Sequence, residues 1–293
     1  MEILITGAAG QLGSDIVKEL KKRDIEYVGV DVTDSHDIDV VDITDVNAVN
    51  AYFTKHKPQM VIHSAAYTAV DKAEDEPELC YKINAQGTEN IAVACKNIGA
   101  QMIYISTDYV FSIDGDEPIL TDAVKAPLSV YGKSKLAGEE AVQRFLDNYY
   151  IVRITWTFGQ GGNNFVKTML KLAQTKDELN VVNDQVGSPT YTVDLAMLLC
   201  DMALQETSRK KYGVYHATSE GYCSWAEFAA EIMRQSGSSC KINPITSDEY
   251  PTKAIRPKNS RLSKDCLDEA GLKRLPTWQN ALSRFLAEIG NDK

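Results

Sequence analysis

Two side chains in the run LSVYGKSKLAGEEAV (128–142) have the types and the spacing for acid–base chemistry. Tyr131 and Lys135 are four residues apart, so they would share one face of a helix. A phenol is a poor proton donor at neutral pH, because its ordinary pKa is about 10. A neighbouring ammonium stabilises the phenolate, so we expect Lys135 to lower the pKa of Tyr131. The same spacing also fits an ordinary helix with one aromatic side chain and one solvated lysine.

Thr107 is the third residue with suitable chemistry. It ends the apolar run QMIYIST (101–107), which predicts a buried strand. Its hydroxyl could hydrogen-bond to a substrate carbonyl and to the hydroxyl of Tyr131. Threonine is common at strand ends, so this interpretation depends on its agreement with the other motifs of the chain.

A glycine turn near the start of the chain predicts a nucleotide site. The apolar run 2–6 is followed by GAAGQLG (7–13) and then by the helical pattern SDIVKELKKR (14–23). A helix N-terminus presents free N–H groups and a positive dipole end, while glycines let a pyrophosphate approach the backbone. The spacing Gly7-x-x-Gly10-x-x-Gly13 is one residue wider at its start than the usual dinucleotide motif. A tight turn without a ligand is the alternative.

Asp31 ends the next predicted strand, EYVGV (26–30). An acidic residue at this place can accept hydrogen bonds from the adenosine ribose hydroxyls. No arginine follows it, and a 2′-phosphate would face a like charge, so Asp31 favours NADH over NADPH. A turn aspartate without a ligand is the alternative.

Strands and helices alternate along the first half of the chain. Further strands are predicted at 59–66, 101–107 and 150–156, with helices at 45–56 and 77–98. This order predicts an α/β fold with a Rossmann-like, doubly wound parallel sheet and a ligand at the carboxyl ends of its strands. The second half predicts helices at 165–174, 192–205 and 224–237, a strand at 213–218, and a Pro-rich loop at 244–260. Ser224 and Glu227 have the spacing of a capping box at the start of helix 224–237.

Composition limits the possible partners. The 293 residues suggest about two domains, and the net charge of −10 without any Lys/Arg run argues against nucleic acid or an anionic membrane. No apolar run is long enough to span a bilayer, and MEILITG at the start shows no signal-peptide pattern. The six cysteines and four histidines show no metal-ligand spacing. We therefore expect a reduced, cytoplasmic protein without a structural metal.

The motifs of the chain resemble those of the extended short-chain dehydrogenases/reductases that act on nucleotide sugars. The likeness covers nearly the whole chain. In the first half it rests on GxxGQLG (7–13), AAYTAVDKAE (65–74), STDYVF (106–111) and PLSVYGKSKLAGE (127–139). In the second half it rests on RITWTFG (153–159), GNNFVKTML (162–170), NDQVGSPT (183–190) and RPKNSRL (256–262). The last three segments separate reductases of this family from their relatives better than the glycine turn does.

The resemblance implies an interleaved pair of domains. The NAD(P)-binding Rossmann domain would comprise residues 1–156, joined by 183–198 and 213–218. The smaller C-terminal domain, which binds the nucleotide sugar, would be the remainder of 157–293. The resemblance does not fix the oligomeric state, so a monomer or a homodimer is expected.

The resemblance also implies a reaction, the reduction of the C4 ketone of dTDP-4-dehydro-L-rhamnose to dTDP-L-rhamnose. This is the last step of dTDP-rhamnose biosynthesis, which serves polysaccharide synthesis. Hydride would come from NADH or NADPH, since the family accepts NADPH as well. Tyr131 would protonate the ketone oxygen, Thr107 would hydrogen-bond to it, and Lys135 would bind the nicotinamide ribose.

The other site residues are carried over from the matching motifs. Expected cofactor contacts are Gly7, Gly10, Gln11, Leu12, Gly13, Asp31, Asp42, Ile43, Ala65, Ala66, Tyr67, Tyr131 and Lys135. Expected substrate contacts are Val70, Thr107, Asp108, Tyr131, Trp156, Asn163, Asn164 and Arg256. Trp156 offers a flat face and an N–H group, or else it packs in the core. Arg256 can bind phosphate in a fork, or else it forms a surface ion pair.

Other activities within this family remain alternatives. Dehydratases of nucleotide sugars carry a glutamate directly after the Thr-Asp pair, and Tyr109 stands there, which argues against dehydration. Epimerases use the same Thr/Ser–Tyr–Lys set. Another NDP-4-keto-sugar reductase and a non-catalytic, dinucleotide-binding regulatory subunit are the remaining alternatives. The intact Thr107, Tyr131 and Lys135 argue against the regulatory subunit.

Overall fold

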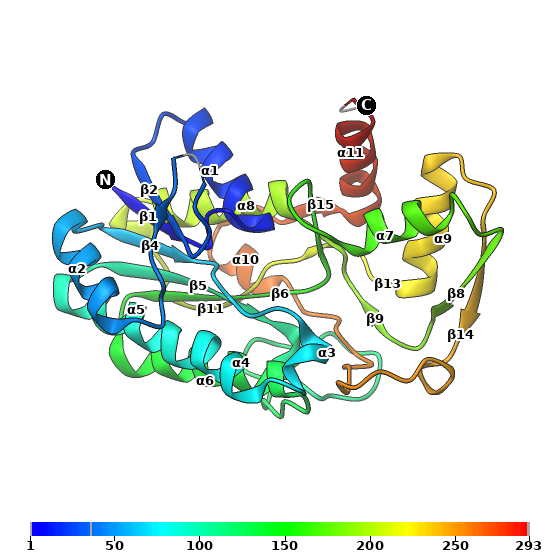
Figure 1. The fold of residues 1–293 in the computed structure, drawn as a ribbon, viewed down its shortest axis with the longest axis horizontal. Helices are drawn as coiled ribbons and strands as arrows, with labels where there is room; N and C mark the ends of the chain where they lie inside the picture. Colours follow the sequence, from blue (N-terminus) through cyan, green and yellow to red (C-terminus); the bar gives the residue numbers. More distant parts are fainter. Residues whose placement is uncertain (1, 36, 292–293) are drawn as a thin grey trace.

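A seven-stranded parallel sheet forms the centre of the computed structural model, which describes residues 2–35 and 37–291 (Figure 1). The strand order is β11-β6-β5-β4-β1-β2-β3, and every pair is parallel. The strands are β1 (Ile3–Thr6), β2 (Tyr27–Asp31), β3 (Asp39–Val40), β4 (Met60–His63), β5 (Gln101–Thr107), β6 (Tyr149–Ile154) and β11 (Gly213–His216). The predicted Rossmann-like α/β fold is confirmed.

The strand order reverses between β1 and β4. The chain leaves β1 towards β2 and β3, and then returns to the other side of β1 to form β4 and β5. Thr6 at the end of β1 is in register with His63 at the end of β4. Because the loops after β1 and β4 turn in opposite directions, they open a crevice at the carboxyl edge of the sheet.

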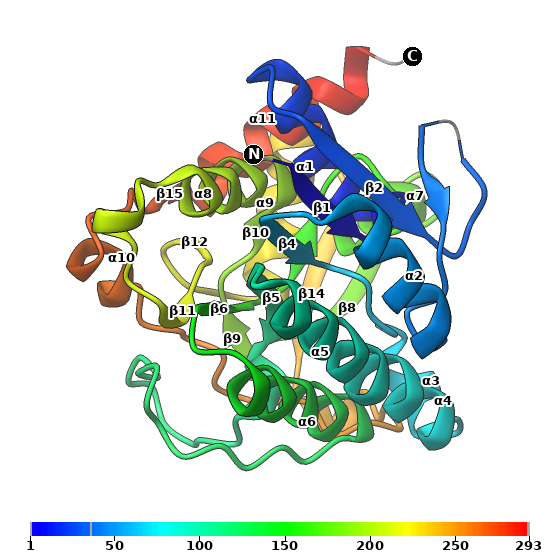
Figure 2. The same ribbon diagram turned by 90° about the vertical axis from the view of Figure 1, so that its left-hand side faces the viewer.

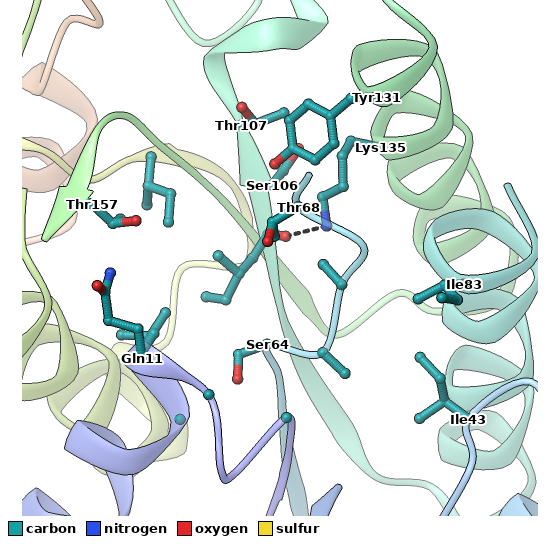
Figure 3. A pocket seen from close by; sticks show the side chains of 18 of the residues that line it. Gln11, Ile43, Ser64, Thr68, Ile83, Ser106, Thr107, Tyr131, Lys135 and Thr157 are labelled. Atoms are coloured by element: carbon teal, nitrogen blue, oxygen red, sulfur yellow. Dashed lines mark hydrogen bonds between the residues drawn. The ribbon is translucent and has the colours of Figure 1, made fainter. Parts of the chain in front are cut away.

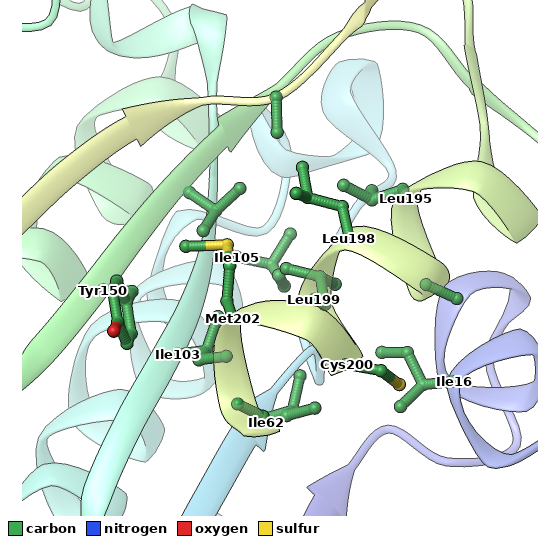
Figure 4. Close-up of a cluster of buried hydrophobic side chains, with 14 of the residues drawn as sticks. Ile16, Ile62, Ile103, Ile105, Tyr150, Leu195, Leu198, Leu199, Cys200 and Met202 are labelled. Atoms are coloured by element: carbon green, nitrogen blue, oxygen red, sulfur yellow. The ribbon is translucent and has the colours of Figure 1, made fainter. Parts of the chain in front are cut away.

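Helices cover both faces of the sheet (Figure 2). On one face lie α1 (Gln11–Lys22) and α8 (Thr192–Leu204), which pack against each other. On the other lie α2 (Val46–His56), α5 (Thr88–Ile98) and α6 (Val130–Phe145). Ile16 of α1, Leu199 of α8 and Ile103 of β5 meet in one buried cluster (Figure 4). Each such side chain contributes about 1.5–3 kcal/mol when fully buried, so the site rests on a rigid base.

The predicted helix 77–98 is present, but its middle turn is wider than an α-helix. It runs as α4 (Pro77–Tyr81), a π-helical segment η1 (Lys82–Gly87) and α5, after the short α3 (Val70–Ala73). A Cβ on Gly87 would lie 2.7 Å from the Ile43 side chain, so the segment approaches the loop after β3 closely. A π-helical turn is often found at functional sites.

The C-terminal part has a core of its own around Phe158, Phe228 and Phe285. It contains α7 (Phe165–Leu172), α9 (Trp225–Ser236), α11 (Trp278–Asn291) and a parallel strand pair, β8 (Glu178–Val182) with β14 (Lys241–Ile245). The capping box predicted for Ser224 and Glu227 is confirmed at the start of α9. The β8–β14 pair is not among the predicted elements.

The remaining elements are short. They are η2 (Asp108–Val110), β7 (Thr157–Phe158), β9 (Val186–Gly187), β10 (Thr190–Tyr191), η3 (Thr207–Arg209), β12 (Ser219–Glu220), β13 (Cys223–Ser224), η4 (Ser247–Glu249), α10 (Asp265–Glu269) and β15 (Leu275–Thr277). α8 and β11 belong to the layers of the central sheet, while β9 pairs with β13 and β10 with β7. The exact division into two domains stays a prediction. None of the helices in the described part of the chain has the length and apolar character needed to cross a bilayer.

Candidate active site

A cavity of about 860 Å³ lies at the carboxyl ends of the central strands (Figure 3). The loops after β1, β2, β3, β4, β5 and β6 contribute to its wall, together with α6, η1 and residues from the C-terminal part. The structure brings most of the predicted residues into this wall. They are Gly7, Gly10, Gln11, Leu12, Gly13, Asp31, Asp42, Ile43, Ala65, Ala66, Val70, Thr107, Asp108, Tyr131, Lys135, Trp156, Asn163 and Arg256.

The glycine turn is shaped by close backbone approaches. Gly7 has a φ of +69°, and a Cβ there would lie 2.7 Å from the Ala65 nitrogen. A Cβ on Gly13 would lie 2.0 Å from the Gly7 carbonyl oxygen, so the first turn of α1 can fold against the loop only without one. Gly10, at the N-cap of α1, makes no side-chain cap. The helix therefore starts at the cavity with its positive end and its first N–H groups available for an anion.

Asp31 lies at the end of β2 in the cavity wall. Its carboxylate accepts hydrogen bonds from the backbone nitrogens of Ala9 at 3.1 Å and Val32 at 2.7 Å. These bonds fix the carboxylate beside the glycine turn. Val32 and Thr33 follow it in the sequence and add no positive charge.

Thr107, Tyr131 and Lys135 face the same side of the cavity, opposite the glycine turn (Figure 3). α6 supplies Tyr131 and Lys135, and Thr107 is the last residue of β5. The helix starts just before Tyr131 because the Ser129 hydroxyl caps it, accepting from the Gly132 nitrogen at 3.1 Å. The sheet edge and the capped helix thus place the three predicted groups together.

The electrostatics of Tyr131 differ from the prediction. Burial raises its pKa well above the usual range, and a hydrogen bond from Thr107 opposes this only in part. Lys135 is 2% exposed and donates to the Ile105 carbonyl at 2.7 Å. Burial lowers the pKa of Lys135 to about 7, although Glu139 opposes the shift. The predicted lowering of the Tyr131 pKa by Lys135 is therefore wrong for this structure, because desolvation dominates and the ammonium is directed at a carbonyl.

A buried ion pair between Arg153 and Glu139, which the sequence did not reveal, stabilises the elements that carry Thr107 and Lys135. Arg153 of β6 and Glu139 of α6 are both 0% exposed, with two hydrogen bonds of 2.8 Å from the guanidinium to the carboxylate. The Ser106 hydroxyl donates to the same carboxylate at 2.6 Å, and Arg153 also donates to the Thr121 carbonyl. Glu139 lies one turn after Lys135, and Ser106 precedes Thr107. The pair therefore joins the three elements that position the site.

Two stacked indoles form the wall nearest the C-terminal part. Trp156 follows β6 with a φ of +48°, a left-handed conformation that is strained for a bulky residue. Its ring stacks on Trp225 with centroids 3.7 Å apart, and both residues line the cavity. Trp225 starts α9 and was not among the predicted site residues, because the capping pattern described only its helix. Indole pairs of this kind offer a flat apolar surface with N–H donors.

Arg256 forms the ion pair that was one of its two predicted roles, and phosphate binding stays a prediction. It lines the cavity, and its guanidinium contacts the Asp71 carboxylate at 2.5 Å and the Tyr109 hydroxyl at 3.2 Å. The same Asp71 accepts the Ala254 backbone N–H at 3.1 Å. The Asp71 carboxylate, directly after Val70 in α3, therefore holds the backbone of Ala254 and the guanidinium of Arg256 at the cavity edge.

Two predicted contacts lie outside the cavity wall. Asn164 caps α7 by accepting from the Lys167 nitrogen, and its amide donates to Gln11 and to the Gly159 carbonyl. The Tyr67 hydroxyl donates to Glu76 at 2.8 Å. Both side chains are hydrogen-bonded to neighbouring loops. Asn163, beside Asn164, lines the cavity instead.

The comparisons with known proteins cover almost all of the chain. The profile of the RmlD substrate binding domain matches residues 1–291. A dTDP-4-dehydrorhamnose reductase of Escherichia coli (strain K12) is 39% identical over 99% of this chain and 98% of its own length. The crystal structure of a dTDP-4-dehydrorhamnose reductase from Clostridium acetobutylicum is similar with a TM-score of 0.93 and 46% identity, covering 99% of this chain and 100% of that one. The crystal structure of a dTDP-4-dehydrorhamnose reductase from Bacillus anthracis in complex with NADP is similar with a TM-score of 0.92 and 40% identity, covering 98% of this chain and 99% of that one.

Proposed function

The chain belongs to the family of the RmlD substrate binding domain, and from this we propose that it is an NAD(P)H-dependent reductase of dTDP-4-dehydro-L-rhamnose. The product is dTDP-L-rhamnose, in the last step of dTDP-rhamnose biosynthesis. The observation that carries the proposal is the convergence of Thr107, Tyr131 and Lys135 on the cavity opposite the glycine turn. The named activity of relatives that match almost the full length supports the choice of substrate.

The residues around the glycine turn fit a nicotinamide dinucleotide. The open N-terminus of α1 suits a pyrophosphate, and the close approach of Gly7 and Gly13 keeps side chains out of its way. Asp31 accepts from the adenosine ribose, and Lys135 donates to the nicotinamide ribose. When bound, the dinucleotide supplies the hydride.

Tyr131 and Thr107 act on the ketone of the substrate. As C4 gains hydride, negative charge develops on the ketone oxygen, and a positioned acid lowers the barrier. Tyr131 protonates this oxygen, and its high pKa in the structure keeps the proton on the phenol until that moment. Thr107 donates a hydrogen bond to the same oxygen from the end of β5.

The C-terminal part provides the seat for the dTDP group. Trp156 and Trp225 offer a flat face for the base or the sugar, and Arg256 binds the diphosphate as a fork. Asn163 and Val70 also line the cavity. The ion pair with Asp71 holds the guanidinium at the cavity, and its remaining N–H donors are available to the phosphates.

We infer a preference for NADH over NADPH from Asp31. Its carboxylate is fixed beside the glycine turn, where a 2′-phosphate would meet a like charge. The expected result is a higher kcat/KM with NADH than with NADPH, and a smaller ratio in Asp31→Asn. A ratio that favours NADPH, or one that Asp31→Asn leaves unchanged, contradicts the inference.

The function is tested with purified protein, enzymatically prepared dTDP-4-dehydro-L-rhamnose and NADH or NADPH. One equivalent of cofactor should be oxidised per dTDP-L-rhamnose formed, which excludes an epimerase and a regulatory subunit. Tyr131→Phe should lower kcat by about 10²–10⁴-fold with cofactor affinity retained. Tyr250→Phe, at an exposed tyrosine, is the matched control. Absence of cofactor oxidation overturns the proposal.

A further inference from the structure

Asp108 is a buried carboxyl group in the cavity wall, an expected substrate contact to which the mechanism so far assigns no chemical step. It directly follows Thr107 and is 2% exposed. Its Oδ1 lies 3.0 Å from the Thr107 hydroxyl oxygen, and its Oδ2 lies 2.5 Å from the Ser260 hydroxyl oxygen. In the described part of the chain, hydroxyl groups are its side-chain partners and no cation pairs with it.

The surroundings of Asp108 favour its protonated form. Burial raises the pKa of Asp108 to about 6, although hydrogen bonds from Ser260 and Thr107 oppose the shift. The titratable groups that face it are Tyr109 of the same turn and Tyr131 of α6. The nearby cations are directed elsewhere, since Arg256 contacts the Tyr109 hydroxyl and Lys135 donates to a backbone carbonyl.

The hydroxyl of Thr107 connects Asp108 to Tyr131. This hydroxyl accepts the Tyr109 backbone N–H at 3.2 Å and donates to Asp108 Oδ1 at 3.0 Å. It lies beside the Tyr131 ring at the cavity (Figure 3), close enough to lower the pKa of the phenol. A hydroxyl has a single proton to donate. When Asp108 is ionised, that proton is directed at the carboxylate. When Asp108 is protonated, the carboxyl donates to Thr107, whose own proton is then available to Tyr131.

We propose that Asp108 is the proton reservoir that reloads Tyr131 through the Thr107 hydroxyl. The inference rests on the proposed reductase function. As hydride reaches C4, the electron pair of the C=O bond moves to the oxygen, which takes the proton of Tyr131. The phenolate takes the proton of Thr107, and Thr107 takes the proton of Asp108. Asp108 ends as a carboxylate and regains one proton from water in the cavity after product release, which matches the one proton consumed per reduction.

The buried position gives this relay its advantage. A bound sugar would separate Tyr131 from bulk water, whereas Asp108 carries its proton into the closed site. The negative charges of the bound dinucleotide and sugar nucleotide would raise the pKa of Asp108 further, so more of it would be protonated when the complex forms. The ligands whose reaction uses this proton therefore also favour the protonated form of Asp108.

The first test measures the carboxyl group itself, without turnover. The side-chain ¹³C signal of Asp108 should titrate near pH 6 in the free protein, as its pKa of about 6 requires. Ser260→Ala removes a hydrogen bond that stabilises the carboxylate, so the midpoint should rise by about one pH unit. A midpoint near the ordinary value of about 4, or one that Ser260→Ala leaves in place, overturns the inference.

The second test measures the hydride step in single turnovers as a function of pH. In the wild type the rate of hydride transfer should fall as the pH rises through a midpoint at 6 or higher, because Asp108 loses its proton. This fall is the alkaline limb of the pH–rate profile. Asp108→Asn should abolish this limb and lower the rate about tenfold to hundredfold, while Ser260→Ala should move the limb to higher pH. Thr107→Ser should keep the limb and Thr107→Val should lose it. Asp201→Asn, at the protein surface, is the control and should match the wild type.

These results separate the relay from the proposed function. Turnover with the same limb in the wild type and in Asp108→Asn overturns the relay alone. Absence of turnover in the wild type, whatever the ¹³C titration shows, overturns the reductase function and the relay with it. If Asp108→Asn does not fold, the shift of the limb expected for Ser260→Ala and its loss expected for Thr107→Val still decide.

Discussion

Arg153→Met is the perturbation that most directly tests how the site is held in place. The guanidinium of Arg153 makes two bonds of 2.8 Å to Glu139 and one of 2.8 Å to the Thr121 carbonyl, and both charged side chains are 0% exposed. Methionine fills a similar volume without a charge. The Glu139 carboxylate would remain buried, with the Ser106 hydroxyl as its remaining donor.

The expected loss of stability follows from this burial. Removing one partner of a buried pair costs about 3–5 kcal/mol, because an uncompensated charge stays inside. With a urea slope of about 3 kcal/mol per molar, the unfolding midpoint should fall by about 1–1.7 M. Adding Glu139→Leu should restore at least about 2 kcal/mol, since the groups left without a partner, the Ser106 hydroxyl, the Thr121 carbonyl and the His216 Nε2, are all neutral.

The matched control is Arg234→Met on α9. Arg234 makes the same forked contact with Glu231, with two bonds of 2.7 Å, but its side chain is 70% exposed. Exposed pairs contribute about 0.2–1 kcal/mol, so the control should unfold within about 0.3 M of the wild type. Urea unfolding followed by circular dichroism measures both variants. Equal losses at Arg153 and Arg234 would refute the claim that the buried pair supports the site.

Three further perturbations test the site more locally. Lys135→Met should be more stable than the wild type below pH 7, because burial lowers the pKa of Lys135 to about 7 and the folded wild type holds a buried charge below that pH. This gain in stability should fade as the pH rises from 7 towards about 10.4, the ordinary pKa of lysine. An equal difference between the two proteins at pH 6 and pH 10 in urea unfolding would contradict the reasoning. Trp225→Ala should raise the KM for the dTDP-sugar about three- to tenfold with an unchanged Kd for NADH, because it removes the ring stacked 3.7 Å from Trp156. A change in NADH affinity alone would contradict the placing of the dTDP-sugar at this indole pair. Gly13→Ala should weaken NADH binding at least tenfold by calorimetry, since its Cβ would lie 2.0 Å from a backbone oxygen, whereas Gly290→Ala in open space should bind normally.

The sequence predicts those parts of the molecule that depend on neighbouring residues. The strand, glycine turn and helix at 2–23 follow from apolar runs and from glycine spacing within one segment. Tyr131 and Lys135 share a helix, so their mutual position is fixed by helical geometry. The alternation of strands and helices predicts parallel strands, whose carboxyl ends share one edge, and this brings Thr107 to the same edge as the glycine turn.

The remaining features depend on contacts between distant segments. Glu139 reads as a solvated helix residue and Arg153 as a polar interruption in a strand, and only the packing of α6 on the sheet buries them together. Trp225 reaches the cavity because α9 starts against Trp156, which no local pattern indicates. The direction of the Tyr131 pKa was mistaken for the same reason, since desolvation depends on everything that surrounds the phenol.

The segment RPKNSRL (256–262) makes such distant contacts both at the cavity and at Asp108. Arg256 at its start lines the cavity, while Ser260 donates to Asp108, the residue after Thr107. Backbone bonds from the Ser260 nitrogen to the Val186 oxygen at 2.8 Å, and from the Val186 nitrogen to the Lys258 oxygen at 2.9 Å, fix the segment against β9. Since one short segment carries both side chains, the C-terminal part would tune the proton supply as well as seat the sugar nucleotide. A change of loop sequence that alters the substrate should therefore also shift the pH profile.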